Sequence, residues 1–134
     1  MIEDKSLAVI SILITDDPKL SYQQYFDWKE AINTPITTFD FDNHSDSYTI
    51  DLAIKLLDAS SYAFIQLDVS SENEEVKGVH RFFNTAIRKY RTKVSVVFNV
   101  EHPKLKSYLK VLDAKKYQSR PELRQAVVSW VSRC

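Results

Sequence analysis

The sequence predicts an α/β domain in which a five-stranded parallel sheet of order 2-1-3-4-5 lies between two layers of helices. Short apolar runs alternate with amphipathic segments along the whole chain, which is the pattern of strand–helix units. The length of 134 residues is that of one domain, and halving it would leave two cores too small to be stable. We therefore expect residues 1–134 to form a single three-layer αβα domain.

The first half of the chain contains three predicted strands and two predicted helices. Leu7–Ile14 is apolar on both faces, as in a central strand that is covered by helices on both sides. Residues 21–33 have apolar side chains at helical spacing after a capping serine, and Ile36–Phe41 is the second strand. A further helix begins at Ser47, and Tyr62–Asp68 is the third strand.

The second half continues the alternation. Glu74–Tyr90 predicts a helix with an acidic start and a basic end, and Val94–Asn99 predicts the fourth strand. A helix over residues 103–112 precedes a weak fifth strand at Lys115–Ser119, and Pro121 begins the last helix. Five such units favour the flavodoxin-like strand order, in which ligands bind beyond the carboxyl ends of the strands.

Several classes of site have no support in the sequence. The single glycine, Gly78, falls inside a predicted helix, and the glycine-rich motifs of NAD, FAD and P-loop nucleotide sites are absent. No CxxC or HExxH motif indicates zinc. His44, His80 and His102 are scattered, and we expect each of them at the surface rather than as a ligand or a base.

Membrane insertion and secretion are not indicated either. The longest apolar run is too short to span a bilayer, and no basic segment followed by an apolar run marks a secretory signal. The single cysteine, Cys134, has no internal disulfide partner. These features predict an intracellular, reducing and therefore cytoplasmic location.

The zero net charge hides a strong asymmetry along the chain. Residues 1–75 contain 15 Asp and Glu but 4 Lys and Arg, a net charge of −11, whereas residues 76–134 carry a net charge of +11. Chance segregation on a solvated surface is one interpretation. The other is a basic side, formed by the last three predicted helices, that binds an acidic protein or a second copy of the chain. Nucleic acid is a less favoured partner because the acidic half would repel phosphates.

Carboxylates follow two neighbouring strands of the predicted sheet. Asp16 and Asp17 come after the first strand, and Asp68 ends the third, so the three side chains are expected to converge. Converging carboxylates repel one another unless a cation or a basic group joins them, and oxygen ligands suit Mg²⁺. The alternative is that these aspartates only terminate strands and cap the following helices.

Four short segments near the ends of these strands carry a recognisable pattern. They are ILITDDPKL (Ile12–Leu20), IQLDVSSEN (Ile65–Asn73), VVFNVE (Val96–Glu101) and AKKYQSRPEL (Ala114–Leu123). Together they resemble the receiver domains of response regulators, and the resemblance covers essentially the whole chain. It implies a phosphoacceptor role for Asp68, with Mg²⁺ held by the acidic pocket.

The departures from the family pattern imply an atypical receiver. Asn99 stands where the family has Thr or Ser, so the hydroxyl that accompanies switching is missing. Arg120 replaces the family's lysine and keeps the charge on a bulkier, planar group. Tyr117 keeps the aromatic of the fifth strand. The resemblance therefore predicts a signalling domain in which Asp68, Asn99 and Arg120 form the reactive site.

Two other functions remain open. The first is a protein-interaction module of the same fold that uses its basic side without phosphorylation. The second is an enzyme of the TIR-like or nucleoside-deoxyribosyltransferase-like type. Its motivation is the run of Glu72, Glu74 and Glu75 after the third strand, because one of these carboxylates could attack a glycosidic carbon.

Overall fold

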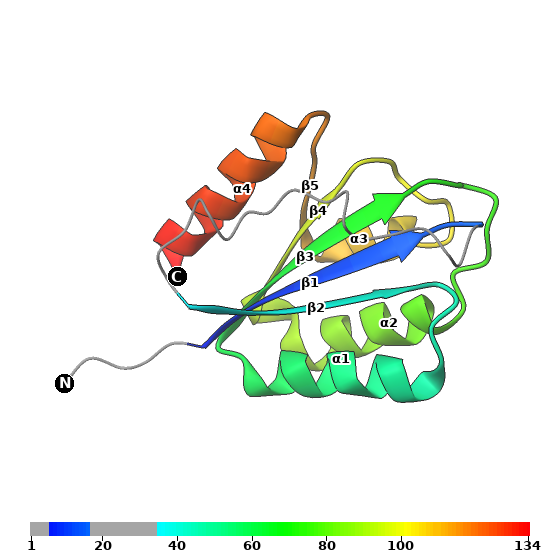
Figure 1. Ribbon diagram of the computed structural model, residues 1–134, viewed down its shortest axis with the longest axis horizontal. Helices are drawn as coiled ribbons and strands as arrows, with labels where there is room; N and C mark the ends of the chain where they lie inside the picture. Colours follow the sequence, from blue (N-terminus) through cyan, green and yellow to red (C-terminus); the bar gives the residue numbers. More distant parts are fainter. Residues whose placement is uncertain (1–5, 17–34) are drawn as a thin grey trace.

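The strands form one parallel sheet of order β2-β1-β3-β4-β5 in the computed structural model, which describes residues 6–16 and 35–134 (Figure 1). They are β1 Leu7–Ile14, β2 Ile36–Asp42, β3 Tyr62–Val69, β4 Val94–Phe98 and β5 Asp113–Lys116. The predicted sheet and its strand order are thus confirmed. The helix predicted over residues 21–33 lies outside the described ranges.

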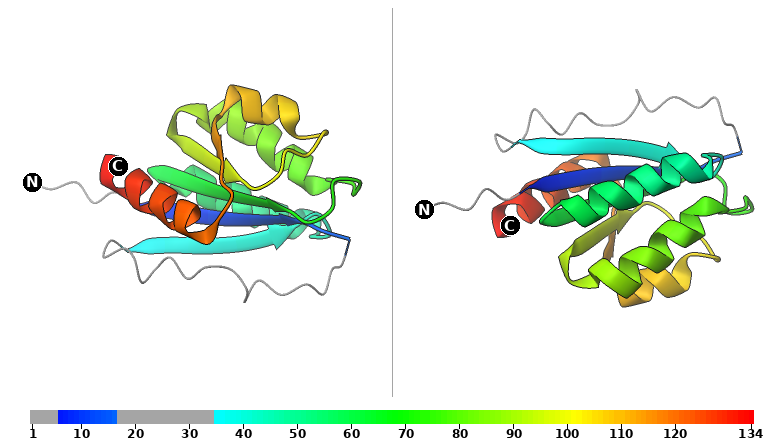
Figure 2. Two further views of the ribbon diagram at one scale, coloured as in Figure 1. Left: turned by 90° about the horizontal axis from the view of Figure 1, so that it is seen from above. Right: turned by 90° about the horizontal axis from the view of Figure 1, so that it is seen from below.

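Helices cover both faces of this sheet. They are α1 Ser47–Ala59, α2 Gly78–Tyr90, α3 Lys106–Val111 and α4 Arg120–Arg133, with a 3₁₀ turn, η3, at Arg91–Lys93. Seen from above in Figure 2, α4 lies in front of the sheet, and seen from below α1 and α2 do. None of the helices in the described ranges is long and apolar enough to cross a bilayer.

The face covered by α1, α2 and α3 is uniformly apolar. Alternate residues of the two central strands, such as Ile10 and Ile65, are fully buried there and are paired across β1 and β3. Ile50 of α1 and Phe82 and Phe83 of α2 complete this core from the helix side. Burying such side chains contributes roughly 1.5–3 kcal/mol each, so this face supplies most of the hydrophobic stabilisation among the described residues.

The α4 face changes character along the strands. Near the amino ends, Phe64 packs on Trp130 of α4 with ring centroids 5.3 Å apart. Toward the carboxyl ends the same face carries polar residues, with Gln66 opposite Ser11 and Asp68 opposite Leu13 in the β1–β3 register. The sheet therefore presents polar groups on one face near the edge where a ligand site was predicted.

Helix α2 begins four residues later than predicted, at Gly78 instead of Glu74. The preceding segment is held out of helical geometry because side chains from other elements bind its carbonyl groups. Lys77, just before the helix, has a φ of 45°. A Cβ on Gly78 would lie 2.9 Å from Cγ1 of Ile50, so the absence of a side chain permits the close approach of α2 to α1.

The last strand and the helix before it also differ from the prediction. Strand β5 spans Asp113–Lys116, two residues earlier than the predicted Lys115–Ser119, although the backbone of Tyr117 still donates to Phe98 at 2.9 Å. The chain then turns because Ser119 caps α4, accepting a hydrogen bond from the Glu122 backbone at 3.3 Å. Helix α3 starts at Lys106, after a turn that follows His102.

Candidate functional site

Asp68, the predicted phosphoacceptor, is a buried residue near the carboxyl end of β3. It is 6% exposed, and its two carboxylate oxygens each accept a hydrogen bond from a neighbour. Gln66 donates to Oδ2 from its amide nitrogen at 2.7 Å, and the hydroxyl of Tyr117 donates to Oδ1. Hydrogen bonds of this kind compensate for the desolvation of a buried carboxylate.

Tyr117 is fixed in its protonated form by this environment. Burial raises the pKa of its hydroxyl, and the hydrogen bond to Asp68 and the negative charge of that carboxylate raise the pKa further. Across the whole neutral range Tyr117 is therefore a hydrogen-bond donor. Tyr117 comes just after β5, and its hydroxyl reaches Asp68 on β3. Because β4 lies between these two strands, the contact crosses the end of β4.

Asn99, the second predicted site residue, follows β4 and holds the end of β3. Its side-chain oxygen accepts from the backbone nitrogens of Val69 and Val100, both at 2.8 Å. Its amide nitrogen donates to the carbonyl of Val69 at 3.3 Å. This amide joins two strand ends through three backbone contacts, which is a structural use of the side chain.

The remaining predicted site residues are placed only in part. Arg120 is an exposed residue at the start of α4, and Asp16 is exposed just after β1. Asp17 lies outside the described residues. Within the described ranges, no three His, Cys, Asp or Glu side chains gather closely enough to hold a metal ion. Because the predicted Mg²⁺ set includes Asp17, the convergence of the three aspartates stays a prediction.

The sequence did not reveal which side chains connect the other loops at this edge by hydrogen bonds. Asn43, which is buried, accepts from the Thr15 backbone at 3.0 Å and donates to the carbonyl of Glu75 at 2.9 Å. His102 was expected at the surface but is 1% exposed. Its Nδ1 accepts from the Lys104 backbone at 3.1 Å, so its Nε2 is the nitrogen that donates to the carbonyl of Glu74 at 2.9 Å.

The glutamates that motivated the enzyme hypothesis lie in the loop between β3 and α2, whose carbonyl groups accept these hydrogen bonds. Glu75 forms a surface ion pair with Lys104 at 2.8 Å, and its side chain is 69% exposed. The hydrogen bond from Lys104 and its charge lower the pKa of the Glu75 carboxyl. An exposed, ion-paired carboxylate is poorly suited to attack a glycosidic carbon.

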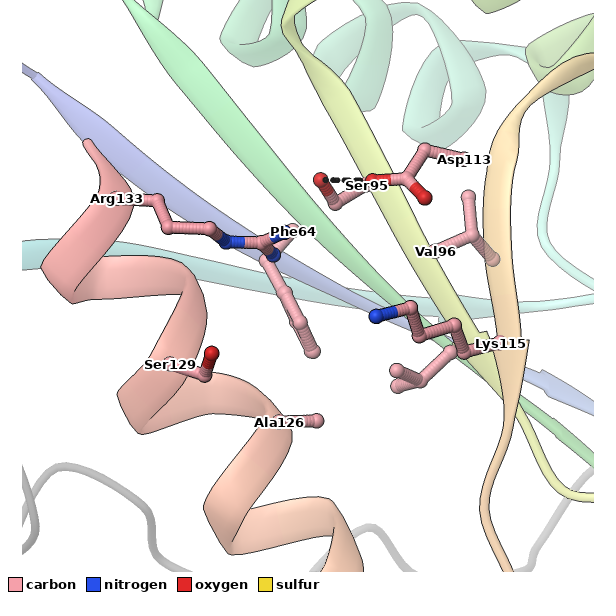
Figure 3. Close-up of a pocket in the computed structure, with 9 residues that line it drawn as sticks. Phe64, Ser95, Val96, Asp113, Lys115, Ala126, Ser129 and Arg133 are labelled. Atoms are coloured by element: carbon pink, nitrogen blue, oxygen red, sulfur yellow. Dashed lines mark hydrogen bonds between the residues drawn. The ribbon is translucent and has the colours of Figure 1, made fainter.

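A groove lies between the sheet edge at β4 and β5 and helix α4. We call it the β5–α4 groove. It has an inner pocket of about 50 Å³ and an adjoining outer hollow of about 320 Å³. Figure 3 shows the inner pocket, into which Lys115 of β5 and Arg133 of α4 point from opposite sides. Its floor contains Phe64.

The cations of this groove lack carboxylate partners within the part of the chain that the structure describes. Lys115, Lys116 and Arg133 belong to no ion pair among the described residues. The two ion pairs found in these ranges, Arg81 with Asp51 and Lys104 with Glu75, lie outside the groove.

Two carboxylates also line the groove, and each accepts a hydrogen bond. Asp113 accepts from the Ser95 hydroxyl at 3.4 Å, and Glu122 accepts from the Gln118 backbone at 3.0 Å. The cations of the groove, in contrast, form no ion pair with any described residue, so their charges can be neutralised by a ligand.

The sequence contains a signal for this groove away from the strand ends. Asp113 and Lys115 of β5 and Tyr117 just after it alternate along the chain and therefore share a face. Ala126, Ser129 and Arg133 recur at intervals of three and four along α4 and likewise share a face.

The chain was also compared with known proteins. No family model, curated protein or solved structure matches it.

Proposed function

We propose that the chain is a receiver-like protein-interaction module that binds an acidic partner through the β5–α4 groove. The observation that carries this proposal is the set of three groove cations, Lys115, Lys116 and Arg133, that form no ion pair within the described ranges. A cation that forms no ion pair favours an anionic partner, because the partner's charge adds attraction without breaking an existing pair.

The environment of Asp68 supports an interaction role over a reactive one. A phosphoacceptor carboxylate needs one oxygen free to attack a phosphorus atom. Both oxygens of Asp68 accept hydrogen bonds, and the residue is 6% exposed. Attack from this position would have to use a lone pair that neither Gln66 nor Tyr117 engages, and the burial of the residue leaves a phosphodonor little access.

Affinity capture tests the proposal directly. The tagged chain should recover a partner from its own cell extract at low salt. Recovery should be lost when Lys115→Glu, Lys116→Glu and Arg133→Glu are combined, because the groove then repels an acidic surface. Asp68→Asn should still recover the partner. A partner that binds the triple variant as well as the wild type would contradict the proposal.

Phosphoryl acceptance is the second candidate function, and one observation favours it. Asp68 lies at the carboxyl end of the central strand β3, at the edge of a 2-1-3-4-5 sheet where ligands of such folds bind. Asp16 and Asp17 would hold Mg²⁺ beside it.

Intact mass measurement after incubation with acetyl phosphate and Mg²⁺ distinguishes the two functions. Phosphoryl acceptance predicts the added mass of one phosphoryl group, absent in Asp68→Asn. The interaction proposal predicts an unchanged mass. Thermal melts provide a second readout: if three carboxylates repel in the metal-free protein, Asp68→Asn raises its melting temperature and Mg²⁺ raises that of the wild type.

A further inference from the structure

We infer that the inner pocket of the β5–α4 groove binds the carboxylate of a single glutamate or aspartate side chain in an extended acidic segment of a partner protein. This inference rests on the proposed function and makes its partner chemistry specific.

The arrangement of charges at the pocket fits one carboxylate. Lys115 approaches from β5 and Arg133 from α4, and the hydroxyl of Ser129 faces the same opening (Figure 3). A guanidinium presents a planar pair of donors to a carboxylate, while an ammonium adds a point charge from another direction. Ser129 can donate a further hydrogen bond to the same anion.

The size of the pocket limits what enters it. Its volume of about 50 Å³ holds a group of a few heavy atoms. Sites for drug-sized molecules are roughly 300–1,000 Å³, so a nucleotide or a sugar does not fit. A carboxylate at the end of a short side chain does.

The pocket also distinguishes among small anions. Asp113 lines it beside the two cations, so the three groups together carry one net positive charge, which a single carboxylate neutralises and a dianion such as phosphate exceeds. The floor is apolar, formed by the 2% exposed ring of Phe64 together with Val97 and Ala126. Such a floor suits the methylene groups of a glutamate.

The outer hollow provides space for the residues that flank this side chain. It shares Lys115, Ala126 and Ser129 with the inner pocket and extends to Tyr117, just after β5, and to Gln125 of α4. Its volume of about 320 Å³ is enough for several residues of an extended chain. Lys116 lines this part together with Glu122, and its ammonium can pair with a second carboxylate of the same segment.

Amide NMR of the full-length ¹⁵N-labelled chain tests the inference, at a salt concentration where sedimentation shows a monomer. The probe is a capped peptide of alternating glutamate and serine, and the control peptide replaces glutamate with glutamine. The glutamate peptide should shift the amides of Ser95, Lys115, Ser129 and Arg133, and the glutamine peptide should not.

Matched variants separate the pocket from general electrostatics. Lys115→Gln and Arg133→Gln should each raise the Kd of the peptide about fivefold, the upper range for an exposed charge pair. Lys110→Gln and Arg88→Gln remove the same charge from exposed positions on α3 and α2, and should change the Kd less than twofold. The spectrum of each free variant shows that it is folded.

Three outcomes would overturn the inference: equal weakening by the control variants, shifts confined to residues outside the groove, or displacement of the peptide by an equal concentration of inorganic phosphate. The wild-type chain can capture a partner that the triple glutamate variant does not, while the peptide gives one of these three outcomes. In that case the interaction function stands and the carboxylate pocket does not. If both experiments fail, the interaction function fails as well.

Discussion

At the scale of single residues, the hydrogen bond between Tyr117 and Asp68 is the contact on which the interpretation of the site depends. The same aspartate at the end of a central strand can be a phosphoacceptor or a buried structural group, and its own identity does not distinguish the two. Its neighbours bear on the choice, because Gln66 and Tyr117 each donate a hydrogen bond to one of its two oxygens. The sequence predicted the position of Asp68 but not these partners, since Tyr117 reaches it across the end of β4 from a position 49 residues away, just after β5.

Removing the Tyr117 hydroxyl should therefore destabilise the folded state. We expect Tyr117→Phe to lower the free energy of unfolding by about 1.5–3 kcal/mol, the usual value for a hydrogen bond to a charged group. Tyr48→Phe is the control, because Tyr48 is 68% exposed and should be neutral. In a double-mutant cycle with Asp68→Ala, the two substitutions should be non-additive by about 1 kcal/mol or more, measured by urea denaturation. Additive effects would mean that the two side chains do not interact in solution.

The raised pKa of Tyr117 also predicts a pH dependence of stability. In the unfolded chain a tyrosine ionises near its ordinary pKa, about 10, whereas folded Tyr117 keeps its proton because burial and Asp68 raise its pKa. The unfolded state therefore loses a proton first, and stability is full below about pH 10 and falls as the pH rises above it. Urea midpoints measured from neutral to alkaline pH should fall more steeply for wild type than for Tyr117→Phe. Parallel profiles would refute this assignment.

At the scale of elements, the centres of strands and helices were predictable and several ends were not. Apolar periodicity marks an element because it reflects burial of a whole face, as in the alternating buried residues of β3. The start of α2 is different, because the residues before it are held by Asn43 and His102, which lie 32 and 28 residues away along the chain. No local pattern encodes such contacts, so the acidic residues at 74 and 75 suggested a helix start that is absent.

Gly78 tests the packing at that start. Alanine is ordinarily the better helix former by about 1 kcal/mol. Here its Cβ would approach Cγ1 of the fully buried Ile50 to 2.9 Å, and Ile50 has no room to withdraw without disturbing the core. We expect Gly78→Ala to lower the free energy of unfolding by about 1–2 kcal/mol, as overpacking usually does. Asn84→Ala, at an exposed position of the same helix, should be neutral or slightly stabilising; a stabilising Gly78→Ala would show that α1 and α2 separate easily.

At the scale of the whole molecule, the division of charge along the sequence is in part a division in space among the described residues. Strand β2 and helix α1 belong to the acidic half of the chain, and β4, β5, α3 and α4 belong to the basic half. β2 and β5 are the outer strands of the sheet, so the two edges come from different halves of the chain, while α2 of the basic half is joined to α1 of the acidic half by the Arg81–Asp51 ion pair. The strand order and the charge counts were enough to predict that the outer strands come from different halves. The β5–α4 groove, where part of the basic charge lies, could be found only from the positions of the side chains.

Such a dipolar arrangement should make association sensitive to salt. We expect sedimentation velocity at low ionic strength to show weak head-to-tail association that disappears at physiological salt, where the screening length is about 8 Å. Combining Lys115→Gln with Arg133→Gln should reduce it, because both positions lie in the basic half. Identical sedimentation at every salt concentration would leave the charge division without a role in self-association.

The lysines of β5 have a second consequence, for aggregation. An outer strand exposes unpaired backbone groups that can recruit the strand of another molecule, and charged side chains on a short strand discourage that recruitment. β5 is four residues long and carries Lys115 and Lys116. The residues proposed to hold a partner's carboxylate thus also act as gatekeepers against sheet extension between molecules. Variants that neutralise both lysines should aggregate more readily, whereas charge reversal to glutamate keeps the edge charged while abolishing the attraction for an acidic partner.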